Sequence, residues 1–158
     1  MKKITLLFLL LICAHSYAQN SNDSEKKAIK VTINQFFDCL KTQDTVLLKK
    51  TVLLNGQIWV ANSRNEPSEF YTRFFKDDIK SFDPNTIFEE KPYSFNINVH
   101  KDMAMAWVPY EFIRNGKFSH CGVDIFTLLK MGSTWKIANV SYSVEEEGCK
   151  NLKSKKEF

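Results

Sequence analysis

The chain has 158 residues, of which 44% are hydrophobic, and a formal net charge of +4. This length suits one domain with a single core. The small basic excess lies mostly at the two ends, and no face gathers the cations that nucleic-acid binding needs. The sequence also lacks a Ser-His-Asp order, a phosphate-binding glycine loop and zinc-ligand spacing, so we expect no nucleic-acid partner, no metal and no cofactor.

The N-terminal segment has the pattern of a secretory signal peptide. Lys2 and Lys3 form a basic start, the run from Ile4 to Ile12 is apolar, and small residues precede position 19. The apolar run is too short for a membrane span. We therefore expect residues 1–18 to be removed by cleavage between Ala18 and Gln19.

A lipid-modified cysteine at Cys13 is an alternative for this segment. Ile12 precedes it, although lipoprotein signals favour a small residue there. No later segment approaches spanning length. The sequence thus predicts an exported chain, periplasmic or extracellular, without a membrane span.

Three stretches with helical spacing follow. The first carries one apolar stripe: Ile29, Ile33, Phe36, Phe37 and Leu40. Asp44 can cap a short second helix that ends before Asn55-Gly56, and residues 57–61 read as a short strand around Trp59. Pro67 and Ser68 can open a third helix, whose apolar positions are Tyr71, Phe75, Ile79 and Phe82.

Four strand patterns occupy residues 88–145. They are separated by turns at Lys101-Asp102, Asn115-Gly116 and Gly132-Ser133, and Asn-Gly between apolar runs is a strong hairpin signal. Helices first and an antiparallel meander second indicate an α+β fold with the helices on one sheet face. We expect a single domain over residues 19–148 and a basic, solvated tail over residues 149–158.

Alternation along the strands divides their side chains between two sheet faces. The set assigned to the face towards the helices is Tyr93, Phe95, Ile97, Val99, Ala104, Ala106, Val108, Tyr110, Phe112, Cys121, Val123, Ile125, Thr127, Ala138, Val140, Tyr142 and Val144. The set assigned to the outer face is Trp107, Glu111, Ile113, Phe118, His120, Asp124, Phe126, Leu128, Trp135 and Ile137. A β-bulge would reverse this assignment for one strand.

The exported chain would contain three cysteines, namely Cys39, Cys121 and Cys149. We favour buried thiols that act as small hydrophobes. A bridge between Cys121 and Cys149 is the alternative, because export permits disulfides, but the chain would have to fold back to form it.

The order of elements resembles the nuclear transport factor 2-like superfamily, including its SnoaL-like and lumazine-binding-like branches. The likeness rests on Phe36-Phe37, on the Trp59 strand, and on residues 122–128 followed by Gly132 and Trp135-Lys136-Ile137. The resemblance implies a cone, in which a strongly bent sheet wraps around three N-terminal helices. It also implies a pocket at the open end and frequent dimers.

The resemblance does not decide between binding and catalysis. In the steroid-isomerase branch an acid stands at the position that matches Thr127, and threonine cannot replace it as a proton donor of tuned pKa. We therefore favour a non-catalytic protein that binds a small apolar or aromatic molecule. The alternatives are an isomerase, cyclase or dehydratase, and a protein-interaction module. The candidate pocket residues are Trp59, Tyr71, Tyr110, Phe112, Cys121, Thr127 and Tyr142.

The outer face is too apolar to be left in water, which predicts a homodimer through it. The candidate interface residues are Trp107, Glu111, His120, Asp124, Phe126 and Trp135. Glu111, His120 and Asp124 would be paired there and fix the register, and His120 would make association depend on pH near neutrality. The competing possibility is that the C-terminal segment or the leader covers this face within one chain.

Overall fold

Four helices are present in the part of the chain that the computed structural model describes. It describes the backbone of residues 2–83 and 85–154, and the side chains of residues 22–83 and 85–154. The helices are α1 (Lys2–Thr42), α2 (Thr45–Thr51), α3 (Phe75–Ser81) and α4 (Cys149–Ser154). The predicted cleavage between Ala18 and Gln19 lies outside the residues with described side chains. Within the described residues, none of the helices combines the length and apolarity that crossing a membrane requires.

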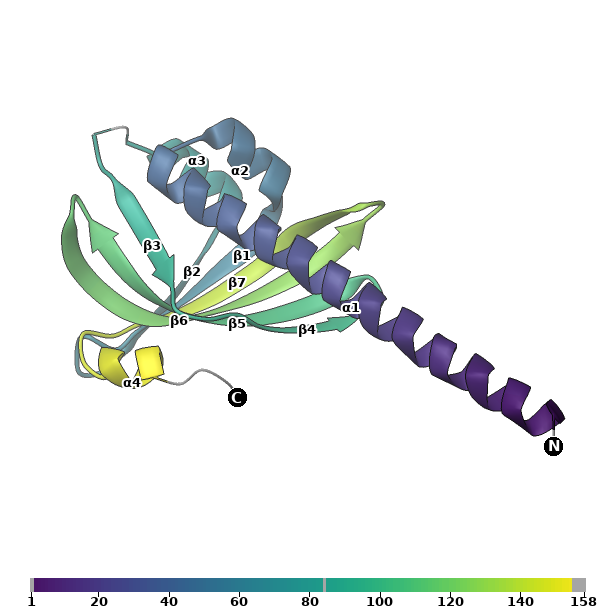
Figure 1. Ribbon diagram of the computed structural model, residues 1–158. Helices are drawn as coiled ribbons and strands as arrows, with labels where there is room; N and C mark the ends of the chain where they lie inside the picture. Colours follow the sequence, from purple (N-terminus) through teal and green to yellow (C-terminus); the bar gives the residue numbers. More distant parts are fainter. Residues whose placement is uncertain (1, 84, 155–158) are drawn as a thin grey trace.

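Seven strands form one curved sheet, and helices α1 to α3 lie on the same face of it (Figure 1). The strands are β1 (Val52–Asn62), β2 (Glu69–Phe74), β3 (Phe88–Pro92), β4 (Asn96–His100), β5 (Met103–Arg114), β6 (Lys117–Met131) and β7 (Thr134–Val144). Their order is β2-β1-β7-β6-β5-β3, and β4 also pairs with β5. The predicted α+β cone is confirmed. The sheet is mixed, because β1 runs parallel to β7.

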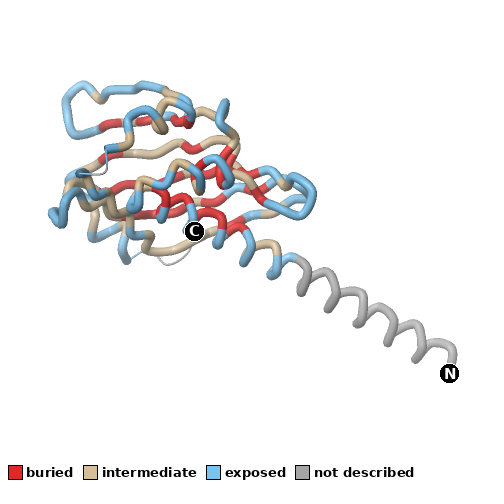
Figure 2. Tube along the Cα trace, turned by 90° about the horizontal axis from the view of Figure 1, so that it is seen from above, coloured by how far each residue is buried: buried red, intermediate tan, exposed pale blue. Residues whose placement is uncertain are grey.

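The core lies between α1 and the concave face of the sheet. Ile29, Ile33, Phe36 and Phe37 are buried at the predicted helical spacing, and Figure 2 shows buried positions both in the helix and in the strands. The rings of Phe36 and Phe37 contact the ring of Phe126 on β6 at centroid distances of 5.8 and 5.9 Å. This aromatic cluster fixes the helix on the sheet, because such pairs add to the free energy of apolar burial.

One cap and one turn signal are confirmed by the backbone, whereas the predicted end of the second helix at Asn55-Gly56 is wrong, because α2 ends at Thr51 and both residues lie in β1. The Asp44 carboxylate accepts hydrogen bonds from the amides of Val46 and Leu47 at 2.8 and 2.9 Å and so caps α2. Asn115 and Gly116 both have positive φ, at 50° and 77°. This is the conformation that a two-residue hairpin turn needs, and it joins β5 to β6.

Two element predictions were wrong. Residues 69–74 form strand β2 rather than the start of the third helix, since they pair antiparallel with β1. That pairing depends on contact with β1 across the loop of residues 63–68, whereas Tyr71, Phe75, Ile79 and Phe82 have helical spacing by sequence alone. The first predicted strand of the meander is two strands, β3 and β4, which pair with different parts of β5.

Two β-bulges overturn the predicted faces of β6 and β7. Ser119 has no partner on β5, because Ile113 pairs with Phe118 and Phe112 pairs with His120. Ala138 is likewise the extra residue of β7 opposite β6. Each bulge shifts the alternation by one residue, so side chains change sides.

Several side chains of β6 and β7 therefore lie on the opposite sheet face from the one predicted. Phe126, Leu128, Trp135 and Ile137 were assigned to the outer face but are buried in the core against the helices. His120 and Asp124, also assigned outside, face inwards as well. Cys121, Val123, Ile125 and Thr127 were assigned to the inner face but alternate with these residues, so they point outwards.

The C-terminal segment folds back on the outer face. Cys149, at the start of α4, forms a disulfide with Cys121 on β6. The favoured prediction of thiols was therefore wrong for these two residues, and among the described side chains Cys39 is the free cysteine and is buried. Lys153 of α4 lies 5.4 Å from the ring of Tyr93, whose hydroxyl donates to Glu111 on β5. Residues 149–154 thus form a short helix that the disulfide holds beside the outer face, although none of its residues is buried (Figure 1).

Candidate functional site

A cavity of about 560 Å³ opens between the C-terminal end of α1, helix α3 and the concave face of the sheet. One group of its lining residues is apolar: Phe36, Leu40, Ile58, Phe82, Phe88, Phe112 and Val140. The other group is polar: Arg64, Tyr71, Arg73, Asp78, Ser81, Glu90, Tyr110, Arg114, Ser119, His120, Asp124 and Tyr142. A concave site with apolar walls and a few convergent polar groups is typical of small-molecule binding.

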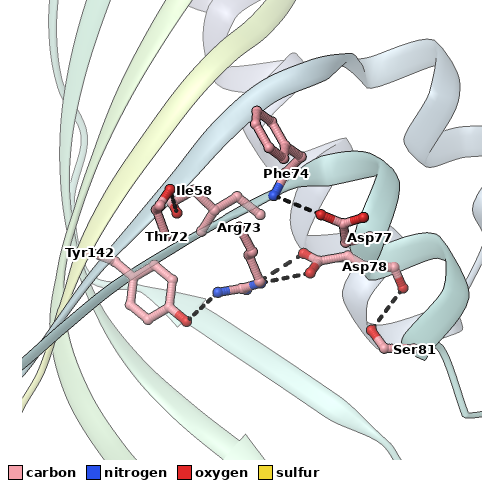
Figure 3. Close-up of polar contacts among 8 residues, drawn as sticks. All are labelled: Ile58, Thr72, Arg73, Phe74, Asp77, Asp78, Ser81 and Tyr142. Carbon is pink, nitrogen blue, oxygen red and sulfur yellow. Dashed lines mark hydrogen bonds and ion pairs between the residues drawn. The ribbon is translucent and has the colours of Figure 1, made fainter.

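Arg73 joins two sides of the cavity (Figure 3). Its guanidinium donates to the Asp78 carboxylate of α3 through Nε at 2.6 Å and through Nη1 to the Tyr142 hydroxyl of β7 at 3.2 Å. Burial disfavours the charge of Arg73, but Tyr142 and Asp78 outweigh burial and raise its pKa. Arg73 is therefore a fixed cation that positions the edge strand β2 against the rest of the wall.

Two carboxyl groups meet inside the cavity. Burial raises the pKa of Asp124 well above its ordinary value, and the neighbouring Glu90 carboxyl adds to this. Burial likewise raises the pKa of Glu90 to about 7, although a hydrogen bond with Asp124 opposes the rise. Asp124 is 3% exposed, and its Oδ2 has no hydrogen-bond partner among the described residues. A hydrogen bond between two carboxyl groups requires a proton, so the pair is both a donor and an acceptor.

An aromatic wall runs along β3, β5 and β6. The rings of Phe88 and Phe112 are 5.7 Å apart, and His120 stacks on Phe112 at 4.8 Å with an interplanar angle of 21°. Tyr110 meets His120 edge to face at 5.9 Å, and the Tyr110 hydroxyl donates to the carbonyl of Ser143 at 2.7 Å. This wall presents flat apolar surface to the cavity.

The imidazole of His120 is neutral in this environment. Burial lowers its pKa to about 4, and the charge of Arg64 contributes. Its Nδ1 lies 3.0 Å from the Ser119 hydroxyl. The predicted pH dependence near neutrality through His120 is therefore wrong, since the ring does not titrate there.

The structure brings together some of the predicted pocket residues and separates others. Tyr71, Tyr110, Phe112 and Tyr142 line the cavity. Trp59 is 47% exposed on β1 and hydrogen-bonds Gln57. Cys121 is bonded to Cys149 on the outer face, and Thr127 points to the same face further along β6. That the four lining residues contact a ligand stays a prediction.

The predicted interface residues are also divided. His120 and Asp124 line the cavity, and Phe126 and Trp135 are buried in the core. Trp107 and Glu111 remain on the outer face, each half-buried. The outer face now owes its apolar character to other side chains, which are Met103, Met105, Leu129 and Met131.

Sequence reasoning missed Arg64, Arg73, Glu90 and Arg114. Arg73 stood in a predicted helix and Arg64 in a predicted loop, and Glu90 and Arg114 are polar positions in strands. Only pairing of β1 with β2, and of β3 with β5, brings them to one cavity.

No group of three or more His, Cys, Asp or Glu side chains suited to a metal exists among the described residues.

Comparisons with known proteins support the fold. No family profile and no curated protein matches the chain. A nuclear transport factor 2-like superfamily protein from Salmonella enterica serovar Typhimurium is similar with a TM-score of 0.61 and 20% identity, over 80% of this chain and 95% of that one. A similar protein of Cytophaga hutchinsonii has a TM-score of 0.63 and 12% identity, over 75% and 97%.

The same architecture occurs in a subunit of an enzyme. A beta subunit assigned to an aromatic-ring-hydroxylating dioxygenase of Novosphingobium aromaticivorans has a TM-score of 0.65 and 12% identity, over 79% of this chain and 92% of that chain. At these identities the similarity concerns the fold alone. The chain thus has the nuclear transport factor 2-like fold, which hosts unrelated functions.

Proposed function

We propose that this protein binds a small, mainly aromatic molecule in the cavity at the open end of the cone. The observation that carries the proposal is the cavity itself, about 560 Å³ in volume with an aromatic wall. Pockets of this size enclose most of the surface of a small ligand. The neutral His120 ring adds to the flat surface without adding a charge.

The unpartnered oxygen of Asp124 supports a ligand with one polar group at its inner end. A buried polar atom without a partner is unusual and costs free energy. Asp124 Oδ2 is such an atom and belongs to a cavity residue. A ligand hydroxyl, amide or carbonyl placed there would satisfy it.

A blocking variant tests this proposal. Ser81 lines the cavity from the end of α3 and is exposed, so Ser81→Trp should fill the mouth without disturbing the core. Lys80→Trp is the matched control, because Lys80 is its exposed neighbour and does not line the cavity. Binding of planar aromatic probes, followed by fluorescence titration and thermal shift, should be lost in Ser81→Trp only. Equal binding by both variants would place the ligand elsewhere.

Acid–base catalysis is the second candidate, and the Glu90–Asp124 pair is the observation that favours it. Raised carboxyl pKa values in a cavity are typical of general acids and bases. Asp124→Asn should abolish any isomerisation or dehydration of a bound ligand while leaving binding measurable. A ligand recovered chemically unchanged from the wild-type protein after prolonged incubation would argue for binding alone.

Export is proposed on the signal-peptide pattern, and the Cys121–Cys149 disulfide supports it because disulfides persist in oxidising compartments. Intact mass and N-terminal sequencing of the protein recovered from its native cell test the proposal. A mature chain starting at Gln19 is the expected result. A chain retaining residues 1–18 would overturn it.

A homodimer through the outer sheet face is proposed on the exposed patch formed by Met103, Met105, Leu129 and Met131. These side chains lie on neighbouring positions of β5 and β6. An apolar patch of this kind is seldom left in water. Sedimentation should show a dimer at tens of micromolar that Met105→Lys with Leu129→Lys dissociates. A wild-type monomer at that concentration would rule it out.

A further inference from the structure

We propose that the ligand is an aromatic monoanion, whose ring lies on the wall of Phe88, Phe112 and His120 and whose carboxylate lies at the rim with Arg64 and Arg114. This inference rests on the proposed function, because it names the chemistry of the molecule in that cavity. It is carried by two observations, the balance of charge around the cavity and the placement of its cations.

The charges that line the cavity do not cancel. Three are cationic, those of Arg64, Arg73 and Arg114, and three side chains carry carboxyl groups. Asp78 is occupied by its ion pair with Arg73. The half-buried Glu90 and the buried Asp124 share a hydrogen bond, which requires at least one proton between the two carboxyl groups. The interior therefore offers at most one further negative charge, while two arginines remain.

Neither of the remaining arginines has a carboxylate partner within the described part of the chain. Arg64 donates through Nε to the side-chain carbonyl of Asn62 at 3.1 Å. The guanidinium carbon of Arg114 lies 5.8 Å from the Phe88 ring centroid. Both side chains are exposed, so an incoming anion can reach them with little loss of hydration. Guanidinium groups bind carboxylates in a bidentate geometry.

The aromatic wall leads from one of these cations towards the inner carboxyl pair. Arg114 stands over Phe88, which contacts Phe112, which in turn stacks on His120. The charge of Arg64 acts on the same His120 ring and helps keep it neutral. A planar ring on this wall would thus have cations at its outer edge and Asp124 at its inner edge.

An aromatic wall alone could also attract a cation, since the faces of rings are electron-rich. Here Arg64 and Arg114 would repel a cationic ligand, and Arg73 already lies over Tyr142 at 5.7 Å. A dianion would meet the ionised fraction of Glu90, whose pKa is about 7. A single negative charge is therefore the best match to the cavity.

Three probes of one shape test the inference: 2-naphthoate, its neutral amide 2-naphthamide, and the cation 2-naphthylmethylammonium. Binding would be measured by fluorescence titration and calorimetry at pH 7.5 in low and high salt. We expect naphthoate to bind at least about tenfold more tightly than the amide and the ammonium ion to bind least. Salt should weaken naphthoate binding only.

Variants locate the effect. Arg64→Gln with Arg114→Gln should remove the preference for naphthoate over the amide, about a tenfold loss, and leave amide binding unchanged. Lys117→Gln is the control, because Lys117 is an exposed cation on the same hairpin as Arg114 and does not line the cavity. Thermal unfolding would verify that the exposed substitutions leave the fold intact.

The results distinguish the claim that the ligand is an anion from the claim that the cavity binds an aromatic molecule. Equal binding of naphthoate and amide, or a preference that survives in the double variant, would overturn the anionic ligand while leaving an aromatic binding site. Tightest binding of the ammonium ion would do the same. Failure of all three probes to bind would overturn both.

Discussion

The indole nitrogen of Trp135 donates a 2.7 Å hydrogen bond to Oε2 of Glu25, which joins α1 to the hairpin of β6 and β7. Lys130 binds the other oxygen of the same carboxylate at 2.6 Å. Trp135 is 2% exposed, so its N–H depends on this acceptor. The contact holds α1 over the sheet at Glu25, which follows the predicted signal segment of residues 1–18.

Glu25→Ala should therefore lower the thermal midpoint by roughly 5 °C, because it leaves the buried indole N–H of Trp135 unpaired. Glu25→Gln is the matched variant. Its amide oxygen can still accept from Trp135, and only the ion pair with Lys130 is lost, so its effect should be smaller. Thermal unfolding followed by circular dichroism measures both. Equal losses would show that the ion pair, rather than the Trp135 hydrogen bond, carries the contribution.

The pH dependence of this contact has a defined sign. Hydrogen bonds from Lys130 and Trp135 lower the pKa of Glu25 in the folded protein. Its stabilising contribution is then present above the unfolded pKa, near 4.5, and is lost as pH falls through the folded pKa. The difference in thermal midpoint between wild type and Glu25→Gln should shrink as pH falls below about 4.5.

The disulfide between Cys121 and Cys149 should contribute on the order of 3 kcal/mol to the free energy of unfolding, given a sequence separation of 28 residues. Cys149→Ser should show that loss in chemical denaturation, and a reducing agent should destabilise wild type equally. Lys153→Gln keeps the disulfide and removes only the contact of α4 with Tyr93, so its loss should be small. A Cys149→Ser variant as stable as wild type would contradict the prediction.

Where the sequence succeeded, the signal was local. The stripe from Ile29 to Phe37 repeats over two turns, Asp44 caps the helix that follows it, and Asn115-Gly116 fixes its own turn. These features depend on neighbours a few residues apart. They were sufficient for the helices-then-sheet order, and hence for the confirmed fold.

Prediction from the sequence failed where one extra residue, Ser119, changed the register of β6. The hairpin at Asn115-Gly116 predicts the face of β6 only as far as Ser119, and the bulge there moves Asp124 and Phe126 inwards. Both alternating sets of β6 are largely apolar, so composition could not reveal the reversal. A pocket at the open end was predicted, but Asp124 was assigned to the wrong face for this reason, and Glu90 was not among the predicted site residues.

Gly122 is a position where the sheet permits no side chain. A Cβ built there would stand 2.0 Å from the carbonyl oxygen of Ser143 on β7, the same oxygen that accepts from the Tyr110 hydroxyl. Gly122→Ala should cost about 2 kcal/mol or more, because backbone must move beside the cavity. Gly132→Asn is the control: nothing lies within 4 Å, and asparagine tolerates its φ of 66°. If denaturant unfolding gives the two variants the same free energy of unfolding, close approach of Gly122 to Ser143 does not limit the side chain at this position.

The Glu90–Asp124 pair should make the fold less stable as pH rises towards neutrality. Burial raises the pKa of Glu90 from 4.5 to about 7. Between those values the unfolded chain releases the proton while the folded protein retains it, so stability falls as pH rises and levels off above the folded pKa. Glu90→Gln removes this titration. Its stability relative to wild type should increase between about pH 4.5 and pH 7.5 by on the order of 2 kcal/mol.

Glu89→Gln is the control of opposite sign for that experiment. Glu89 precedes Glu90 on β3, but hydrogen bonds from Lys41 and Lys91 lower its pKa, although burial opposes them. Its contribution develops as pH rises through the folded pKa and is complete above about pH 4.5, so Glu89→Gln should be less stable than wild type by a constant amount over the range in which Glu90→Gln gains stability. Urea unfolding at a series of pH values measures both variants. Parallel pH profiles for Glu90→Gln and wild type would mean that Glu90 titrates normally and that the cavity holds no proton-sharing pair.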